Sequence, residues 1–120
     1  MKKFLFIISF YDFNKNILEY SKEYLISLDY KVNVAAKCNI KKIIQKLKID
    51  VDIDLNSKEI NLDEYKTIFL ISNTSSSKNC LDDSTINKII LNTTKKNILI
   101  GDIIFNSKKK IKEYIDCFLN

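Results

Sequence analysis

The chain has 120 residues, including 20 lysines and 15 acidic residues, so its formal net charge is +5 at pH 7. It contains no His, Arg, Pro or Trp, and its single Gly is Gly101. These absences exclude His-dependent triads, His-ligated zinc sites, guanidinium clamps on phosphate, and the glycine-rich loops of dinucleotide and P-loop sites.

The first third of the chain predicts a strand, a helix and a second strand. Residues 4–8 form a continuous apolar run rich in Phe and Ile, typical of a strand buried on both faces of a parallel sheet. Residues 16–28 repeat apolar side chains at helical spacing, and Leu28 closes the buried stripe. After a turn at residues 29–30, the second strand is predicted by the alternating Val32, Val34 and Ala36.

The middle of the chain predicts a short helix, a small strand and another apolar strand. Residues 40–47 carry apolar side chains at helical spacing, with lysines around them. Residues 51–55 alternate strictly between apolar residues and Asp. This period of two predicts a half-buried edge strand whose Asp52 and Asp54 side chains point into water. The apolar run at residues 67–72 predicts a strand buried on both faces.

The last part of the chain predicts a polar loop, two helices and a strand between the helices. The loop covers residues 73–79, and a helix follows from about residue 84 to residue 93. Residues 98–100 predict a buried strand that ends just before Asp102. A final amphipathic helix starts near residue 107. Its solvated face carries Lys108, Lys109, Lys110 and Lys112.

Strands and helices alternate along the chain, which predicts an α/β fold with right-handed crossovers and a parallel sheet. We expect one three-layer domain over residues 1–120, with four parallel strands in the order 2-1-3-4 and helices on both faces. This is a flavodoxin-like arrangement, to which the strand at residues 51–55 adds a small extra edge strand. The composition, 46% hydrophobic and 29% charged, is that of an ordinary globular domain.

The excess of lysine has two interpretations. A net positive charge favours binding to nucleic acid or to acidic surfaces. However, Lys, Asn, Ile, Tyr and Phe are all frequent, whereas Arg, Gly, Ala and Pro are scarce, and this joint bias is typical of an AT-rich coding sequence. We therefore do not expect a nucleic-acid partner, and we keep a Lys-rich module that binds nucleic acid or protein as an alternative.

The cysteines and the N-terminal segment predict a cytoplasmic protein. Cys38, Cys80 and Cys117 are far apart and form no C-x-x-C pair, which suits a reducing compartment, and we expect packing roles for Cys38 and Cys117. Lys2 and Lys3 precede an apolar run, as in a signal peptide, but the run is short and no small-residue cleavage site follows. No run approaches the ~18 apolar residues of a transmembrane helix, so we expect no membrane association.

In open α/β sheets, ligands bind beyond the carboxyl ends of the strands, where the strand order reverses. Here that crevice lies between the first strand and the strand at residues 67–72. Three loops are expected to meet there, at residues 10–16, 73–79 and 102–107. Any functional site is therefore expected in these loops.

Three residues at the strand ends are candidates for catalysis. Asp102 follows a buried strand, where a partly desolvated carboxylate could act as a base, and Asp12 follows the first strand. Cys80 precedes a predicted helix, whose N-terminus and nearby Lys78 would lower the pKa of its thiol. The polar loop offers hydroxyls, N–H groups and one ammonium for a small anion. Its candidate ligand-binding residues are Ser72, Asn73, Thr74, Ser75, Ser76 and Lys78.

Two well-known uses of this arrangement do not suit the sequence. The first loop, Phe10-Tyr11-Asp12-Phe13, lacks the hydroxyls and glycine with which a flavodoxin holds the flavin phosphate. A response-regulator receiver needs an acidic pair and a phosphoacceptor Asp where this chain has Ser9 and Ser72-Asn73. We therefore expect no flavin, no other cofactor and no metal ion.

The chain resembles the ThiJ/PfpI family of the class I glutamine amidotransferase-like superfamily. Residues 1–8 resemble the first strand of that family, and residues 51–70 are similar to its small hairpin and following strand. The segment Lys95-Lys96-Asn97-Ile98-Leu99-Ile100-Gly101-Asp102 resembles the strand that ends in the family's nucleophile elbow. Together these stretches follow the family's order and spacing over most of the chain.

The resemblance implies the fold of that family but not its chemistry. Asp102 stands at the position of the elbow Cys, Ser72-Asn73 replaces the family's Gly-Gly turn, and the chain has no His. We therefore expect a degenerate, non-catalytic domain that binds a small anion or a partner at the strand-end crevice and associates into a homodimer. An enzyme that uses Asp102, Asp12 or Cys80 is the alternative.

Overall fold

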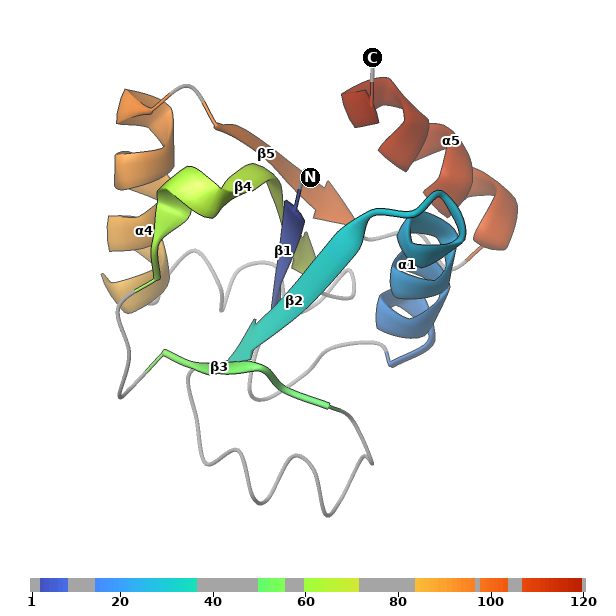
Figure 1. Cartoon of the computed structure of the whole chain (residues 1–120), viewed down its shortest axis with the longest axis horizontal. Helices are drawn as coiled ribbons and strands as arrows, with labels where there is room; N and C mark the ends of the chain where they lie inside the picture. The colour runs from blue at the N-terminus through green and yellow to red at the C-terminus, as the bar shows by residue number, and fades with distance from the viewer. Residues whose placement is uncertain are drawn as a thin grey trace.

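Five parallel strands form the centre of the structure, which is a computed structural model (Figure 1). It describes residues 3–8, 15–36, 50–55, 60–71, 84–96, 98–103 and 107–119. The strands are β1 (Lys3–Ile8), β2 (Lys31–Ala36), β3 (Ile53–Asp54), β4 (Tyr65–Ile71) and β5 (Leu99–Ile103). The helices are α1 (Lys15–Ser27), α4 (Ser84–Lys95) and α5 (Lys108–Leu119), with a 3₁₀ turn, η1 (Leu62–Glu64), before β4.

The sheet has the strand order β3-β2-β1-β4-β5, and every neighbouring pair is parallel. This order confirms the predicted α/β fold, because the four main strands follow the order 2-1-3-4 and the small strand lies at the edge beside β2. The predicted helix at residues 40–47 lies outside the described residues.

Helices cover both faces of the sheet. Figure 1 shows α1 and α5 on one side of the strands and α4 on the other. The side chains of β1 alternate between the two layers: Phe4, Phe6 and Ile8 pack with α1 and α5, whereas Leu5 and Ile7 pack in the second cluster, which includes part of α4. All five are buried, which confirms that β1 is a central strand buried on both faces.

The end of α1 differs from the prediction at Leu28. The helix ends at Ser27, and Asp29 adopts a left-handed conformation with φ 64°. The Tyr30 N–H donates to the Leu25 carbonyl at 3.1 Å and the Asp29 N–H donates to the Ile26 carbonyl at 3.0 Å, the pairing of a Schellman cap. This cap turns the chain away before Leu28 can join the buried stripe, and Leu28 is 42% exposed.

The two edges of the sheet also refine the predictions. The Asp52 N–H donates to the Val34 carbonyl at 2.8 Å, and the Asp52 carboxylate accepts the Val34 N–H at 2.7 Å. Asp52 is exposed, as predicted, but its carboxylate also binds the edge of β2, because β3 is too short to pair this part of β2. At the other edge, β5 is longer than predicted and includes Asp102, and Leu99 is 49% exposed because an edge strand is covered on one side by β4.

Candidate functional site

The carboxyl edge of the sheet is the predicted site. Because the strands are parallel, β1, β2, β4 and β5 all end at this edge, and α1 and α5, which follow β1 and β5, begin there (Figure 1). Most of the predicted site residues lie outside the described part of the chain. They are Asp12, Cys80, Ser72, Asn73, Thr74, Ser75, Ser76 and Lys78.

Asp102 is the candidate catalytic residue that the structure describes. It lies within β5, beside Leu70 of β4, and is half-buried. Its N–H donates to the Tyr114 hydroxyl at 3.0 Å, so α5 holds the backbone of this residue. A nucleophile elbow instead places its residue on a sharp, strained turn between strand and helix. Asp102 has no such strain, because its φ is not positive; among the described non-glycine residues, a positive φ occurs at Asp29.

The helices that begin at this edge bring positive charge to it. The first turns of α1 and α5 contain no acidic residue, and they contain Lys15 and Lys108–Lys110. The N-terminus of a helix carries a partial positive charge that favours anions. At α5 the Ile111 N–H donates to the Ser107 carbonyl at 2.9 Å, and the Lys110 N–H lies 3.5 Å from the Ser107 hydroxyl, so Ser107 caps the helix. The described side of the carboxyl edge therefore suits an anionic ligand.

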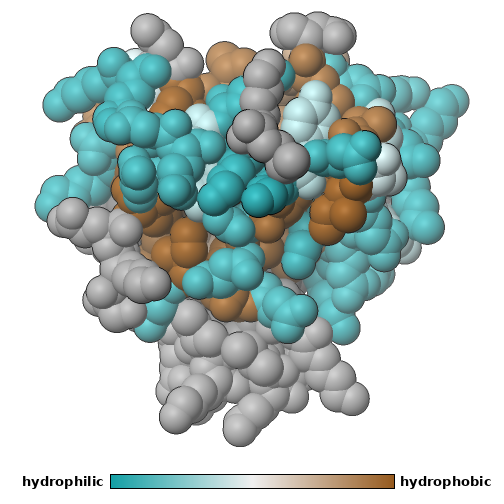
Figure 2. Space-filling model, viewed as in Figure 1, coloured by the Kyte–Doolittle hydropathy of each residue, from teal (hydrophilic) through white to brown (hydrophobic). Residues whose placement is uncertain are grey.

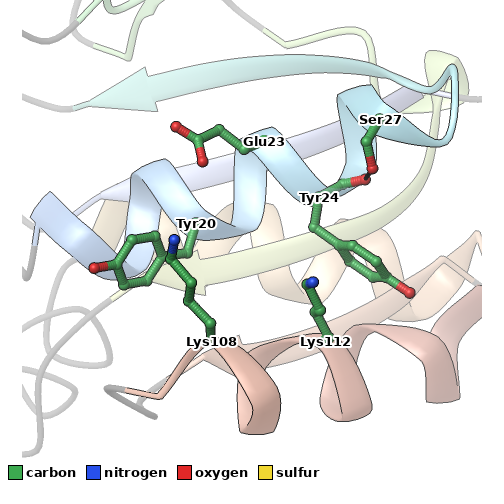
Figure 3. Close-up of a pocket in the computed structure, with 6 residues that line it drawn as sticks. All are labelled: Tyr20, Glu23, Tyr24, Ser27, Lys108 and Lys112. Carbon is green, nitrogen blue, oxygen red and sulfur yellow. Dashed lines mark hydrogen bonds between the residues drawn. The ribbon is translucent and has the colours of Figure 1, made fainter.

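A second feature, a groove between α1 and α5, was not predicted from the sequence. It has a volume of about 210 Å³. It is lined by Tyr20, Glu23, Tyr24, Ser27, Lys108 and Lys112 (Figure 3). The sequence does contain one signal for it, since both the tyrosine pair and the lysine pair are four residues apart and each pair therefore lies on one helix face.

In this groove the two lysines lie over tyrosine rings. The Lys108 Nζ is 4.7 Å from the centre of the Tyr20 ring, and the Lys112 Nζ is 5.6 Å from the centre of the Tyr24 ring. Cation–π contacts of this kind stabilise by about 0.5–1 kcal/mol each at exposed sites. Lys108 and Lys112 are exposed, as the predicted solvated face requires, and they also lie over the aromatic rings of α1, which the sequence did not predict.

The Tyr24 hydroxyl donates a hydrogen bond to the Asp116 carboxylate, which links α1 to α5. This bond, together with burial and the negative charge of Asp116, raises the pKa of Tyr24 above its usual value of 10.0. The folded state therefore holds this proton more tightly than the unfolded state does. Its contribution to stability is present below pH 10.0 and is lost as the pH rises through the higher pKa of the folded state.

We expect Asp116→Asn to lower the pKa of Tyr24 towards 10.0 and to remove this part of the alkaline loss of stability. The measurement is a pH titration of the Tyr24 ring resonances by NMR, beside unfolding curves above pH 9. Glu113→Gln, one turn earlier on α5, is the matched control and leaves the titration of Tyr24 in place. An unchanged Tyr24 titration in Asp116→Asn would contradict the hydrogen bond.

Cys117 does not have the packing role predicted for it. Its side chain is exposed, and its Sγ donates weakly to the Glu113 carbonyl at 3.4 Å. It lies two residues, about 200° of helical rotation, beyond the buried Ile115, and so it points away from the sheet. Cys38 lies outside the described residues.

The described residues include neither a metal-binding cluster nor a membrane-spanning helix. In this part of the chain, no group of three or more His, Cys, Asp and Glu side chains is arranged to hold a metal ion. None of the helices that the structure describes has the length and apolar character needed to span a membrane.

Comparisons with known proteins identify the fold. No protein-family model and no curated protein sequence matches the chain. Among solved structures, a ThiJ/PfpI domain protein from Brachyspira murdochii aligns with a TM-score of 0.63 at 13% identity. The alignment covers 83% of this chain and 57% of that protein. The VC2308 protein aligns with a TM-score of 0.65 at 12% identity, over 85% of this chain and 52% of its own.

A third match, the Rapid Encystment Protein 24 kDa of Francisella tularensis, has a TM-score of 0.61 at 15% identity and covers 85% of this chain and 58% of its own. The chain therefore spans little more than half the length of each of these proteins. Their agreement in fold at low identity matches the parallel sheet and strand order described above. The chain therefore has the α/β fold of ThiJ/PfpI domain proteins.

Proposed function

We propose that this chain is a non-catalytic ThiJ/PfpI-like domain that binds a small anion, or an anionic group of a partner, at the carboxyl edge of its sheet. The observation that carries the proposal is the positive charge at this edge, where α1 and α5 begin with lysines and without an acidic residue in their first turns. The loop after β4, with Lys78, starts from the same edge and would supply further N–H groups, hydroxyls and one ammonium.

The surroundings of Asp102 support a binding role over a catalytic one. Asp102 is a paired strand residue held by the Tyr114 hydroxyl, and residues 103–107 separate it from the start of α5. A nucleophile in an elbow is exposed on a short turn that leads directly into the helix, and a His usually activates it. The sequence has no His, so the base of such a reaction would have to be another residue.

The binding half of the proposal is tested by calorimetric titration with inorganic phosphate at low ionic strength. We expect saturable binding in the millimolar range, weakened at least about threefold by Lys78→Gln, because one of the few cations around the anion is lost. Lys95→Gln is the matched control, since it removes the same charge at the opposite end of α4. Equal weakening by both variants, or no saturation by wild type, would contradict a site at this edge.

The non-catalytic half is tested with an activated ester such as p-nitrophenyl acetate. We expect the protein to release nitrophenolate no faster than the Asp102→Asn variant does. A rate that falls in Asp102→Asn, or in Asp12→Asn or Cys80→Ser, would favour the alternative of an enzyme that uses these residues. The cytoplasm is the compartment that we propose for the domain, because its three widely spaced cysteines suit a reducing environment.

A further inference from the structure

Two lysine ammonium groups in the groove between α1 and α5 are held by aromatic rings and not by carboxylates. The Lys108 Nζ lies over the Tyr20 ring, and the Lys112 Nζ lies over the Tyr24 ring. Among the described residues, no carboxylate lies within ion-pair distance of either ammonium group. The groove therefore offers two positive charges to an anionic ligand.

The spacing of the two ammonium groups indicates which ligand they fit. Lys108 and Lys112 are one turn apart on α5, as Tyr20 and Tyr24 are on α1, so the two positive charges are separated by about 6 Å along the groove. An aliphatic chain of about three or four methylene groups separates two carboxylates by a similar distance. A dicarboxylate of this length therefore reaches both lysines at once.

The shape and lining of the groove suit a small molecule of this kind. Its volume of about 210 Å³ corresponds to about seven water molecules at ~30 Å³ each. Tyr20 and Tyr24 are half-buried, and their rings point towards α5 (Figure 3), so they offer apolar surface to a methylene chain. Because the rings already hold the two ammonium groups, less side-chain freedom is lost when a ligand binds.

Acidic side chains around the groove favour a small dianion over an extended polyanion. Glu19 and Glu23 are exposed one turn apart on α1, and the Glu23 carboxylate points away from both lysines (Figure 3). These carboxylates leave the ammonium groups unneutralised, but they repel a nucleic acid or an acidic peptide that extends over α1. Asp116, one turn beyond Lys112, does the same at that end of the groove.

The wider surface agrees with a charged ligand. Figure 2 shows that the surface over α1 and α5, on the right of the view, is predominantly hydrophilic, whereas apolar side chains gather in the middle over the sheet. The apolar part of the groove is therefore confined to the two tyrosine rings that line it.

We propose that this groove is a second ligand site, which binds a free aliphatic dicarboxylate of about five or six carbon atoms. One carboxylate binds Lys108 and the other binds Lys112, while the methylene chain lies against Tyr20 and Tyr24. The site is separate from the one proposed at the carboxyl edge, because the described residues that line it belong to α1 and α5 and not to the loop after β4. The inference therefore does not depend on the proposed function.

The exposure of the lysines sets the expected affinity. Both ion pairs form at the surface, where each contributes little, so we expect glutarate to bind with a dissociation constant of about 1 mM at low ionic strength. Pentanoate has the same carbon chain with one carboxylate, and we expect it to bind at least about threefold more weakly. Malonate is too short to reach both lysines and should be weakened similarly. Raising NaCl to about 0.5 M should abolish measurable binding.

The test is a titration with glutarate followed by ¹H–¹⁵N NMR. We expect saturable shifts in the amides of residues 20–27 and 108–116, which surround the groove. Lys108→Gln and Lys112→Gln should each weaken binding at least about threefold, because each removes one ion pair. Lys109→Gln is the matched control, since it removes the same charge from an exposed residue beside Lys108 that does not line the groove, and it should bind like wild type.

The inference is overturned by glutarate that does not saturate, by pentanoate or malonate that binds as tightly as glutarate, or by equal weakening in Lys109→Gln and Lys112→Gln. Lys78→Gln separates the two sites. If it weakens glutarate binding as strongly as Lys112→Gln does, the dicarboxylate lies at the carboxyl edge and this inference fails while the proposed function stands. If phosphate does not bind while glutarate binds in the groove, the proposed function alone fails.

Discussion

Phe69→Ala is expected to lower the free energy of unfolding by about 3–5 kcal/mol, the largest effect of any single substitution considered for this chain. Phe69 is fully buried on the central strand β4. Its ring meets Phe118 edge-on at 5.1 Å and Phe6 at 5.7 Å, and it stacks on Phe4 at 6.0 Å. The truncation leaves a cavity among these rings, at the point where the sheet meets α5. Urea unfolding followed by circular dichroism measures the loss.

Two further variants make this prediction decisive. A loss of 3–5 kcal/mol is a large part of the stability of a typical domain, so Phe69→Ala itself could fail to fold. Phe69→Leu keeps most of the volume, and we expect it to fold with a loss of about 1 kcal/mol. Leu99→Ala, at an exposed position on β5, should change the stability by no more than about 0.5 kcal/mol. Equal losses in Phe69→Leu and Leu99→Ala would contradict the aromatic core described here.

Gly101→Ala is expected to lower the free energy of unfolding by about 2 kcal/mol, because this glycine makes room for a close approach of two rings. A Cβ at Gly101 would lie 2.8 Å from Phe118 Cζ and 2.8 Å from Phe69 Cδ1. Its φ is not positive, so the requirement is for space and not for a special backbone conformation. The fully buried Phe69 ring cannot move aside, whereas the half-buried Phe118 ring can in part.

A double variant tests this cause directly. Phe118→Leu removes the Cζ atom that meets the new methyl group. Gly101→Ala should therefore cost clearly less in the Phe118→Leu background than in wild type, by about 0.5–1 kcal/mol. The measurement is a double-mutant cycle from chemical unfolding of the four proteins. Strictly additive losses would show that the contact with Phe118 does not limit the space at residue 101.

The sheet could be predicted from the sequence because buried strands appear as local apolar runs and the connections between parallel strands have a fixed handedness. Continuous apolar runs mark β1 and β4 as buried strands, and the right-handed crossover rule then leaves few possible strand orders. The predictions were wrong where a single turn or a single neighbouring strand determines whether a side chain is buried. Leu28 fits the helical stripe by its spacing, but the left-handed Asp29 ends the helix first. Leu99 fits a buried strand by its composition, but β5 lies at the edge of the sheet.

The α1–α5 groove could not be predicted in the same way. Tyr20 and Tyr24 are separated from Lys108 and Lys112 by most of the chain, and only the relative placement of the two helices brings them together. The spacing of four residues shows that each pair shares a helix face, but it does not show that the two faces meet. The carboxyl edge, in contrast, could be predicted, because the topology of a parallel sheet brings the loops after the strands to one edge. Of the three candidate catalytic residues predicted at this edge, Asp102 is the one that the structure describes.

The position of Asp102 supports the proposed non-catalytic role. Asp102, which the sequence resemblance places at the elbow Cys, lies inside a strand, and its backbone N–H is held by Tyr114 of α5. The parallel sheet is kept while the local turn that would expose a nucleophile is absent at this described residue. At the carboxyl edge, the two helix starts and their lysines bring positive charge, which suits an anionic ligand.

A phosphate titration followed by ¹H–¹⁵N NMR tests the binding site at the carboxyl edge most directly. We expect saturable shifts in the amides of residues 9–14 and 72–78 and in the first turns of α1 and α5, where the strand ends and helix starts meet. We also expect the amides in the last turn of α4, which carries Lys95 at the other edge of the sheet, to stay in place. Shifts that are spread over all exposed lysines, or that gather away from the carboxyl edge, would contradict the proposed site.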